Sequence, residues 1–149
     1  TVVNVSSVVG RVALPGAGAY SASKFALEAM SDAARNEVEA FGIDITLIEP
    51  GPVQTGFAER VTTEIEGIDR EGPYEKLYSI IDSATAVASD GPGSIPPARV
   101  AEDILNAASA TKPAARYPTG TPGRIGVLAR FVPTRLRDAL YNAVESLGG

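Results

Sequence analysis

The chain has 149 residues, of which 44% are hydrophobic, and both values suit a single domain that buries an apolar core. Its formal net charge of −5 argues against a general nucleic-acid-binding protein. The absence of cysteine and histidine excludes disulfides and thiolate metal sites, so we expect no metal, and Tyr, Lys, Asp, Glu and Ser are the remaining acid–base candidates.

No stretch of the chain reaches the apolar length of a membrane span, and none has the pattern of a signal peptide. The expected location is therefore the cytoplasm. The chain begins with Thr-Val-Val-Asn-Val, a β-branched run typical of a buried strand already under way. From this beginning we expect that an N-terminal portion precedes the chain.

The first half of the chain alternates between strand and helix patterns. Residues 1–5 predict a strand, and apolar side chains at helical spacing predict a helix over residues 17–41, which Gly42 would end. Residues 43–49 predict a second strand, stopped by the Pro-Gly-Pro of residues 50–52. A strand, a long helix and a second strand make a βαβ unit, so the two strands should be parallel.

Parallel strands bring three separate segments to one rim of the sheet. Ser6 and Ser7 follow the first strand, the long helix begins a few residues later, and residues 50–55 follow the second strand. Open α/β sheets bind their ligands at this rim, outside the carboxyl ends of the strands. Alternation along an extended chain predicts that only one of the two serines faces the site.

Tyr20 and Lys24 are the candidate chemical pair. On a helix, side chains four residues apart stack on one face. A cation within about 4–6 Å favours the phenolate and lowers the tyrosine pKa, and a tyrosine tuned in this way can exchange a proton with an alcohol oxygen. The pair could also be an accident of an amphipathic helix, but of the five tyrosines only Tyr20 has a lysine four positions later.

The segment after the second strand predicts a cover for this rim. Apolar residues recur at helical spacing over residues 57–65 and again over residues 74–81. Because these helices directly follow the rim, we expect residues 56–94 to form a substrate lid; a packed insertion is the alternative. Residues 90–97, rich in glycine and proline, have the composition of a linker.

The last part of the chain predicts another helix, a short strand and a helical tail. The helix covers residues 97–110, and residues 115–117 predict the strand. Residues 124–149 combine apolar positions with several arginines and predict a C-terminal helical extension. It could bind an anionic membrane surface or an oligomer partner, or close the substrate pocket as an outer helix. The expected inward side chains of the helix over residues 97–110 are Val100, Ile104, Leu105 and Ala108.

Three motifs in this order resemble the second half of a classical short-chain dehydrogenase/reductase: Asn4-Val-Ser-Ser7, Tyr20-Ser-Ala-Ser-Lys24 and Pro50-Gly-Pro-Val-Gln-Thr55. Residues 47–57 and the Arg116-Tyr-Pro segment are similar to the 17β-hydroxysteroid and retinol dehydrogenase-like branch. The resemblance covers most of the chain. It implies an α/β fold in which residues 1–149 form the catalytic, C-terminal portion of a Rossmann-type doubly wound parallel sheet, with three parallel strands and flanking helices.

The resemblance also implies a role for each matching residue. Tyr20 would be the general acid/base, Lys24 would hold the nicotinamide ribose, and Ser7 would stabilise the substrate oxygen, with Ser6 as the alternative. The implied cofactor-binding residues are Tyr20, Lys24, Pro50, Gly51, Val53 and Thr55. The expected substrate-binding residues are Ser7, Phe57, Val61, Tyr74 and Tyr78.

The implied reaction is hydride transfer between NAD or NADP, with NADP favoured, and a secondary alcohol or ketone. The apolar lid predicts a steroid-, retinoid- or lipid-like substrate. We expect a homodimer or homotetramer. The glycine-rich turn and the asparagine of the family's cofactor and proton-relay sites are absent from these residues, so the 149-residue chain should be inactive alone. A non-catalytic dinucleotide sensor or scaffold on the same fold is the alternative.

Overall fold

Three parallel strands form one sheet in the computed structural model, which describes residues 1–147. They are β1 (Val2–Val5), β2 (Ile45–Pro50) and β3 (Arg116–Thr119), in the spatial order β1-β2-β3. In the register, Val2 lies opposite Ile45, and Leu47 lies opposite Arg116. All six residues of the central strand β2 are buried, as expected for a parallel strand covered on both faces. The predicted α/β fold with three parallel strands is confirmed.

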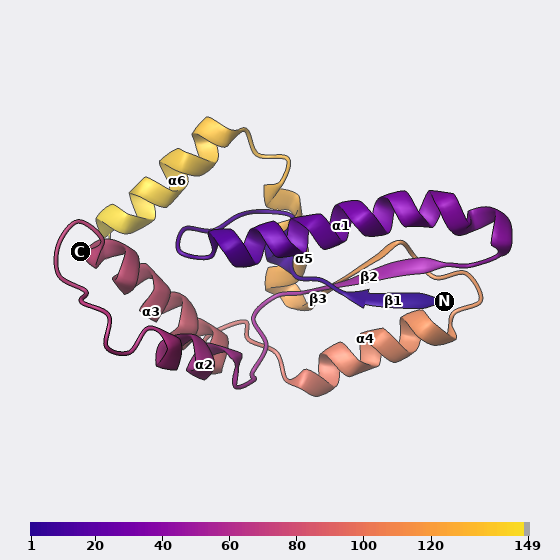
Figure 1. Cartoon of the computed structure of the whole chain (residues 1–149), viewed down its shortest axis with the longest axis horizontal. Coiled ribbons are helices and arrows are strands. Elements are labelled where there is room, and N and C mark those ends of the chain that lie inside the picture. Colours follow the sequence, from indigo (N-terminus) through magenta and orange to yellow (C-terminus); the bar gives the residue numbers. More distant parts are fainter. Residues whose placement is uncertain (148–149) are drawn as a thin grey trace.

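Two helices cover the opposite faces of the sheet (Figure 1). α1 (Gly18–Val38) lies on one face, and α4 (Pro97–Ser109) lies on the other. The short helical turns η1 (Val8–Gly10) and η2 (Glu39–Phe41) precede and follow α1, and Gly42, with φ 68°, ends the second turn. The β1–α1–β2 connection is therefore the βαβ unit that the sequence predicts.

The other helices lie mostly beyond the carboxyl ends of the strands. α2 (Phe57–Glu64) and α3 (Glu75–Asp90) contact each other there, and α6 (Thr134–Leu147) ends the described part of the chain (Figure 1). α5 (Gly120–Ala129) follows β3 directly and packs against it. The predicted extension over residues 124–149 corresponds to most of α5 and to α6, and its residues 148–149 lie outside the described part. The side chain of Tyr141 in α6 donates a hydrogen bond of 3.2 Å to the Ala13 carbonyl.

The face of α1 that packs on the sheet is small and polar. Its buried residues are Ser21, Glu28 and Ser31, whereas Phe25 is 43% exposed and Met30 is 69% exposed. Ser31 accepts a hydrogen bond of 2.9 Å from the Asn4 side chain of β1. Phe25 and Met30 thus lie away from the sheet, and the short side chains of Ser21 and Ser31 are the ones buried against it.

The expected inward face of α4 is partly wrong. Leu105 is 68% exposed and Ala108 is also exposed, whereas the buried residues are Asp103 and Ala107. Asp103 can enter the interior because Arg99, one turn earlier, pairs with its carboxylate at 3.2 Å. The helix is therefore rotated relative to the apolar pattern, and Val100 and Ile104 lie at its half-buried flank.

Candidate active site

Tyr20 and Lys24 lie next to each other at the start of α1. The Lys24 Nζ is 5.7 Å from the centroid of the Tyr20 ring, within the range of a cation–π contact. The same Nζ donates a hydrogen bond of 3.1 Å to the carbonyl of Val5, the last residue of β1. The tyrosine–lysine neighbourhood expected from helical spacing is therefore present, and the lysine ties α1 to the carboxyl end of β1.

Ser7 and Ser6 point to different surroundings. The Ser7 hydroxyl accepts from the Val9 N–H at 3.3 Å, which caps η1, and donates to the Pro50 carbonyl at 3.4 Å. The Ser6 hydroxyl is buried with no hydrogen-bond partner among the described residues, and a Cβ placed on Gly10 would lie 2.9 Å from it. The side chain of Ser7, not that of Ser6, thus contacts Pro50, the last residue of β2.

The segment Pro50 to Thr55 runs along the rim beside Ser7. A Cβ on Gly51 would lie 3.0 Å from the backbone N of Gly123, so α5 approaches too closely for a larger residue. Thr55 accepts a hydrogen bond of 3.4 Å from the Phe57 N–H, and its side chain is exposed at the start of α2. The segment therefore contacts Ser7 through the Pro50 carbonyl, packs against α5 at Gly51 and carries an exposed hydroxyl at Thr55.

Ile95 fixes the middle of this segment. Val53 forms a parallel bridge with Ile95, and the backbone hydrogen bonds Gln54 N–H to Ile95 and Ile95 N–H to Pro52 measure 2.9 and 3.0 Å. The Gly/Pro-rich composition of residues 90–97 predicted a plain linker, and the pairing corrects that expectation. The chain returning from α3 instead pairs with the rim segment at Val53.

An apolar pocket of about 200 Å³ opens beside Tyr20. The Tyr20 and Phe57 rings both line it and contact each other, with centroids 5.3 Å apart and ring planes tilted by 39°. Thr85 is the only polar lining side chain apart from Tyr20. Tyr74 and Tyr78 are not among the lining residues, and their assignment to the substrate stays a prediction. The lining residues are Leu14, Pro15, Gly16, Ala17, Tyr20, Phe57, Ala58, Val61, Ile81, Ala84, Thr85 and Ala88.

A larger cavity, of about 400 Å³, lies at the opposite edge of the sheet. It is lined by Ile45, the first residue of β2, and by Ala115, which precedes β3, together with residues of α1, η2 and the preceding loops. Because the strands are parallel, this edge is the far end from Pro50. The larger cavity therefore has no share in the geometry around Tyr20, and the smaller apolar pocket is the one that adjoins the candidate chemistry.

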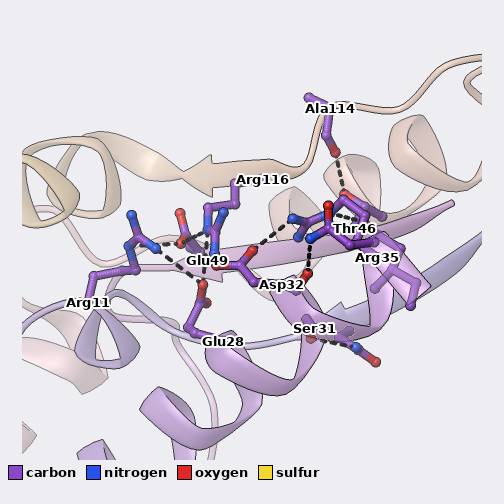
Figure 2. A network of polar contacts seen from close by, with 12 residues as sticks. Arg11, Glu28, Ser31, Asp32, Arg35, Thr46, Glu49, Ala114 and Arg116 are labelled. Atoms are coloured by element: carbon purple, nitrogen blue, oxygen red, sulfur yellow. Dashed lines mark hydrogen bonds and ion pairs between the residues drawn. The ribbon is translucent and has the colours of Figure 1, made fainter. Parts of the chain in front are cut away.

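A cluster of six charged residues, which we call the charge cluster, lies between α1 and the sheet (Figure 2). It extends from Glu49, next to Pro50, to Arg35, which donates to the Ile45 carbonyl at the start of β2. Two of its carboxylates are almost completely inside the protein: the side chain of Glu28 is 6% exposed and that of Glu49 is 0% exposed. The members of the charge cluster are Arg11, Glu28, Asp32, Arg35, Glu49 and Arg116.

Arg116 is the centre of the charge cluster. Its Nε donates to Glu28 at 3.0 Å and lies 3.3 Å from Glu49 Oε1, and its Nη2 donates to Asp32 at 2.7 Å. Arg11 lies 3.6 Å from Glu28 and 3.5 Å from Glu49. Both oxygens of Glu49 lack a hydrogen bond from any described residue, so this carboxylate is held by charge at ion-pair distances.

Burial and neighbouring charges shift several pKa values in the charge cluster. Burial, followed by the negative charge of Glu28, raises the pKa of Glu49 from 4.5 to about 7, and Arg11 and Arg116 oppose this rise. For Asp32, burial acts to raise the pKa, but hydrogen bonds from Arg116 and Arg35 outweigh it and the pKa is lowered. Glu49 is therefore a buried carboxyl that changes its charge near neutral pH.

Sequence reasoning missed the charge cluster. One signal was available: Glu49 is the one charged residue of a mostly apolar strand, and the rim segment follows it directly. A second was the repeat of Tyr20, Lys24, Glu28 and Asp32 at four-residue intervals along α1. Neither signal names Arg11 or Arg116 as partners, because those contacts join segments far apart in the chain.

Two general properties of the described residues complete the description. Within residues 1–147, no cluster of three or more Asp, Glu, His or Cys side chains is arranged to hold a metal ion. No helix in the same part of the chain is both long and apolar enough to cross a membrane.

Residues 1–66 match the protein family described as short chain dehydrogenase. The chain is 36% identical over 142 residues to the uncharacterized oxidoreductase YbbO of Escherichia coli, an alignment that covers 93% of this chain and 47% of that protein. It is 34% identical over 154 residues to retinol dehydrogenase 7 of Mus musculus, covering 93% of this chain and 46% of that enzyme. The chain spans about half the length of the curated relatives it matches.

A solved structure has a similar fold. A crystal structure of a short-chain dehydrogenase from Streptomyces avermitilis superposes with a TM-score of 0.64 at 28% sequence identity. The superposition covers 97% of this chain and 50% of that one. Sequence and structure comparisons thus point to the same group of proteins as the Tyr20–Lys24 motif.

Proposed function

Since this chain belongs to the short-chain dehydrogenase/reductase family, we propose that its protein is an oxidoreductase that transfers a hydride between NAD or NADP and a secondary alcohol or ketone. The observation that carries the proposal is that the matching residues lie close together in the structure. The Tyr20–Lys24 pair, Ser7 and the segment from Pro50 lie together at the carboxyl ends of β1 and β2, and the apolar pocket opens beside Tyr20.

The residues at the rim fit a nicotinamide dinucleotide. The Lys24 ammonium and the exposed Thr55 hydroxyl supply hydrogen-bond donors there. When bound, the dinucleotide supplies the hydride chemistry. Lys24, Pro50, Gly51, Val53 and Thr55 would hold it, together with Tyr20. The preference for NADP stays a prediction, which the ratio of kcat/KM values for the two cofactors would test.

Tyr20 handles the proton in this proposal. Its phenolic oxygen gives a proton to the carbonyl oxygen during reduction, or takes one from the hydroxyl during oxidation. The positive charge of Lys24 stabilises negative charge on that oxygen. The two hydrogen bonds of Ser7, at 3.3 and 3.4 Å, are long, so its hydroxyl can turn toward the substrate oxygen and stabilise the charge that develops there.

The pocket supports an apolar substrate. Apart from the Tyr20 and Thr85 side chains, every residue that lines it is apolar, so hydrocarbon next to the reacting carbon would be removed from water without leaving a polar group unpaired. We assign a steroid-, retinoid- or lipid-like alcohol or ketone to it, with Phe57 and Val61 in contact with the hydrocarbon. Turnover confined to small polar sugars, with none for apolar ketones, would contradict this assignment.

Replacing Tyr20 with Phe tests the function. Tyr20→Phe should lower kcat by at least about a hundredfold, because the proton donor is lost, while the Kd of the cofactor stays within about twofold. Tyr117→Phe is the matched control: the Tyr117 hydroxyl accepts from the Ala114 N–H at 3.1 Å, away from the rim. A protein that only senses or scaffolds the dinucleotide would bind cofactor equally well with and without the Tyr20 hydroxyl and would show no turnover in either form.

The remaining expectations concern the whole protein. We assign residues 1–149 to the catalytic half of a single dehydrogenase domain, with residues 56–94 as lid, and expect no turnover by the 149-residue chain alone. Measuring NADPH consumption by this chain and by a longer form that carries a glycine-rich dinucleotide turn tests both statements. A homodimer or homotetramer and a cytoplasmic location stay predictions.

A further inference from the structure

Glu49 is buried next to the proposed site but touches none of its reactants. It is the penultimate residue of β2 and immediately precedes Pro50, whose carbonyl accepts the Ser7 hydrogen bond. Its carboxylate contacts Arg11 at 3.5 Å and Arg116 at 3.3 Å. A charged group in this position can influence the reaction through the segments that it holds.

Arg11 connects Glu49 to Ser7. It directly follows η1, the turn that Ser7 caps, and its own N–H donates to the Val8 carbonyl at 3.0 Å. The next N–H inside the turn, that of Gly10, donates to the Ser7 carbonyl at 2.9 Å. A displacement of the Arg11 guanidinium is therefore passed through one tight turn to the Ser7 backbone.

Glu28 connects the same group to the tyrosine helix. Tyr20, Lys24 and Glu28 lie at successive four-residue intervals on α1, and Glu28 pairs with Arg11 at 3.6 Å. A Cβ on Gly10 would lie 3.1 Å from both the Glu28 Cγ and the Lys24 carbonyl, so η1 and α1 are in close contact here. The charge cluster thus joins the three segments that carry Ser7, Tyr20 and Pro50.

A buried ion-pair cluster is a costly way to stabilise a fold. Taking each charge out of water is unfavourable, and apolar residues of the same volume often serve stability as well or better. What charges provide is a defined geometry, because an arginine between two carboxylates has few satisfactory positions. Resting on the proposed function, we propose that Glu49 is a positioning residue, which holds Arg11 and thereby sets Ser7 and Pro50 at the spacing the reaction needs.

The contact between Glu49 and Arg11 depends on the charge of Glu49. The groups that face it are Glu28 from α1, Arg11 after η1 and Arg116 from β3. Asp32 from α1 pairs with Arg116, and Arg130 after α5 acts on Arg11 through its charge. Burial and Glu28 raise the pKa of Glu49 to about 7, so the attraction to Arg11 develops as the pH rises through neutrality. Positioning of Ser7 should therefore weaken below neutral pH.

The test uses Glu49→Gln, which keeps the shape of the side chain and removes its charge. In the variant kcat should fall by about ten- to hundredfold, the loss expected from a misplaced catalytic group, while the cofactor Kd stays within about twofold. The wild-type kcat should also show an ionisation near pH 7 that the variant lacks. Glu102→Gln is the matched control, since Glu102 is an exposed acid paired with Arg99 at 3.0 Å and lies far along the chain in α4.

Hydrogen exchange gives a second readout that needs no activity. The N–H groups of Gly10, Arg11 and Val12 all bond within η1 or its end, and they should exchange faster in Glu49→Gln than in the wild type or in Glu102→Gln. If Glu49→Gln fails to fold, Arg11→Gln breaks the same contact from the other partner. It should likewise lower kcat and speed the exchange of the three N–H groups. The double variant should be no worse than either single variant.

Three outcomes overturn the proposal. They are a wild-type kcat in both single variants, unchanged exchange of the three N–H groups, or fully additive losses in the double variant. A wild-type protein with no cofactor-dependent turnover would refute the proposed function instead, and the exchange comparison would then decide the positioning role by itself.

Discussion

Replacing Glu49 with Gln should remove a pH-dependent loss of stability from this protein. In the folded state, burial and the charge of Glu28 raise the pKa of Glu49 to about 7, whereas the unfolded chain has the ordinary value of 4.5. Between these two values the folded protein keeps a proton that the unfolded chain has released. The contribution of Glu49 to the free energy of unfolding is therefore highest below pH 4.5 and decreases as the pH rises to about 7.

The size of the effect follows from the two pKa values. One unit corresponds to about 1.4 kcal/mol, so the difference between 4.5 and about 7 is worth about 3 kcal/mol over the whole range. Between about pH 5 and about pH 8 it amounts to about 2–3 kcal/mol. That is a large share of the stability of an ordinary domain, about 5–15 kcal/mol, so the change is measurable. Glutamine does not titrate, and the variant should lack this decrease.

Urea unfolding followed by far-UV circular dichroism is the suitable assay, because the chain contains no tryptophan to report on the core. The free energy of unfolding would be measured at about pH 5 and about pH 8 for the wild type, Glu49→Gln and Glu102→Gln. Relative to the wild type, Glu49→Gln should gain about 2–3 kcal/mol between the lower and the higher pH, and Glu102→Gln should run parallel to the wild type. Parallel curves for wild type and Glu49→Gln would refute the raised pKa of this buried carboxyl.

Two substitutions test the packing around the rim. Phe57→Ala removes the ring whose centroid lies 5.3 Å from that of Tyr20. It should raise KM for an apolar ketone about tenfold or more, with little change in kcat. An unchanged KM in steady-state assays would show that Phe57 does not touch the substrate. Gly51→Ala places a Cβ 3.0 Å from the Gly123 backbone and should destabilise the protein by about 1–3 kcal/mol. Gly18→Ala is the control and should not destabilise it, because no atom lies within 4 Å of the added carbon. Equal melting temperatures for the two variants would count against the close approach of α5.

Much of the proposed site follows from rules that act over a few residues. The period of the apolar side chains identifies α1, and the helix then places Lys24 beside Tyr20 because residues four apart share a face. The two parallel strands bring Ser7 and Pro50 to the same rim. These inferences needed no knowledge of which distant side chains meet.

The tertiary structure decided what the local patterns leave open. Ile95 pairs with Val53 although its surroundings predict a linker, and Leu105 faces solvent although it belongs to an apolar pattern. In both cases the contact depends on how a helix is rotated or where a returning segment lies, and the sequence pattern encodes neither. Composition also cannot rank cavities, so the larger cavity at the opposite edge of the sheet was not foreseen.

The charge cluster shows the difference most clearly. In the sequence, Arg11, Glu49 and Arg116 are three charged residues separated by tens of positions, and each alone suggests an exposed side chain. Only the packing of α1 and β3 on β2 buries Glu49 between the two arginines and raises its pKa to about 7. The sequence by itself determined the neighbours on one helix and the rim they share, because those follow from backbone geometry. The fold alone decided which charges are buried together, because burial is a property of the whole packed structure.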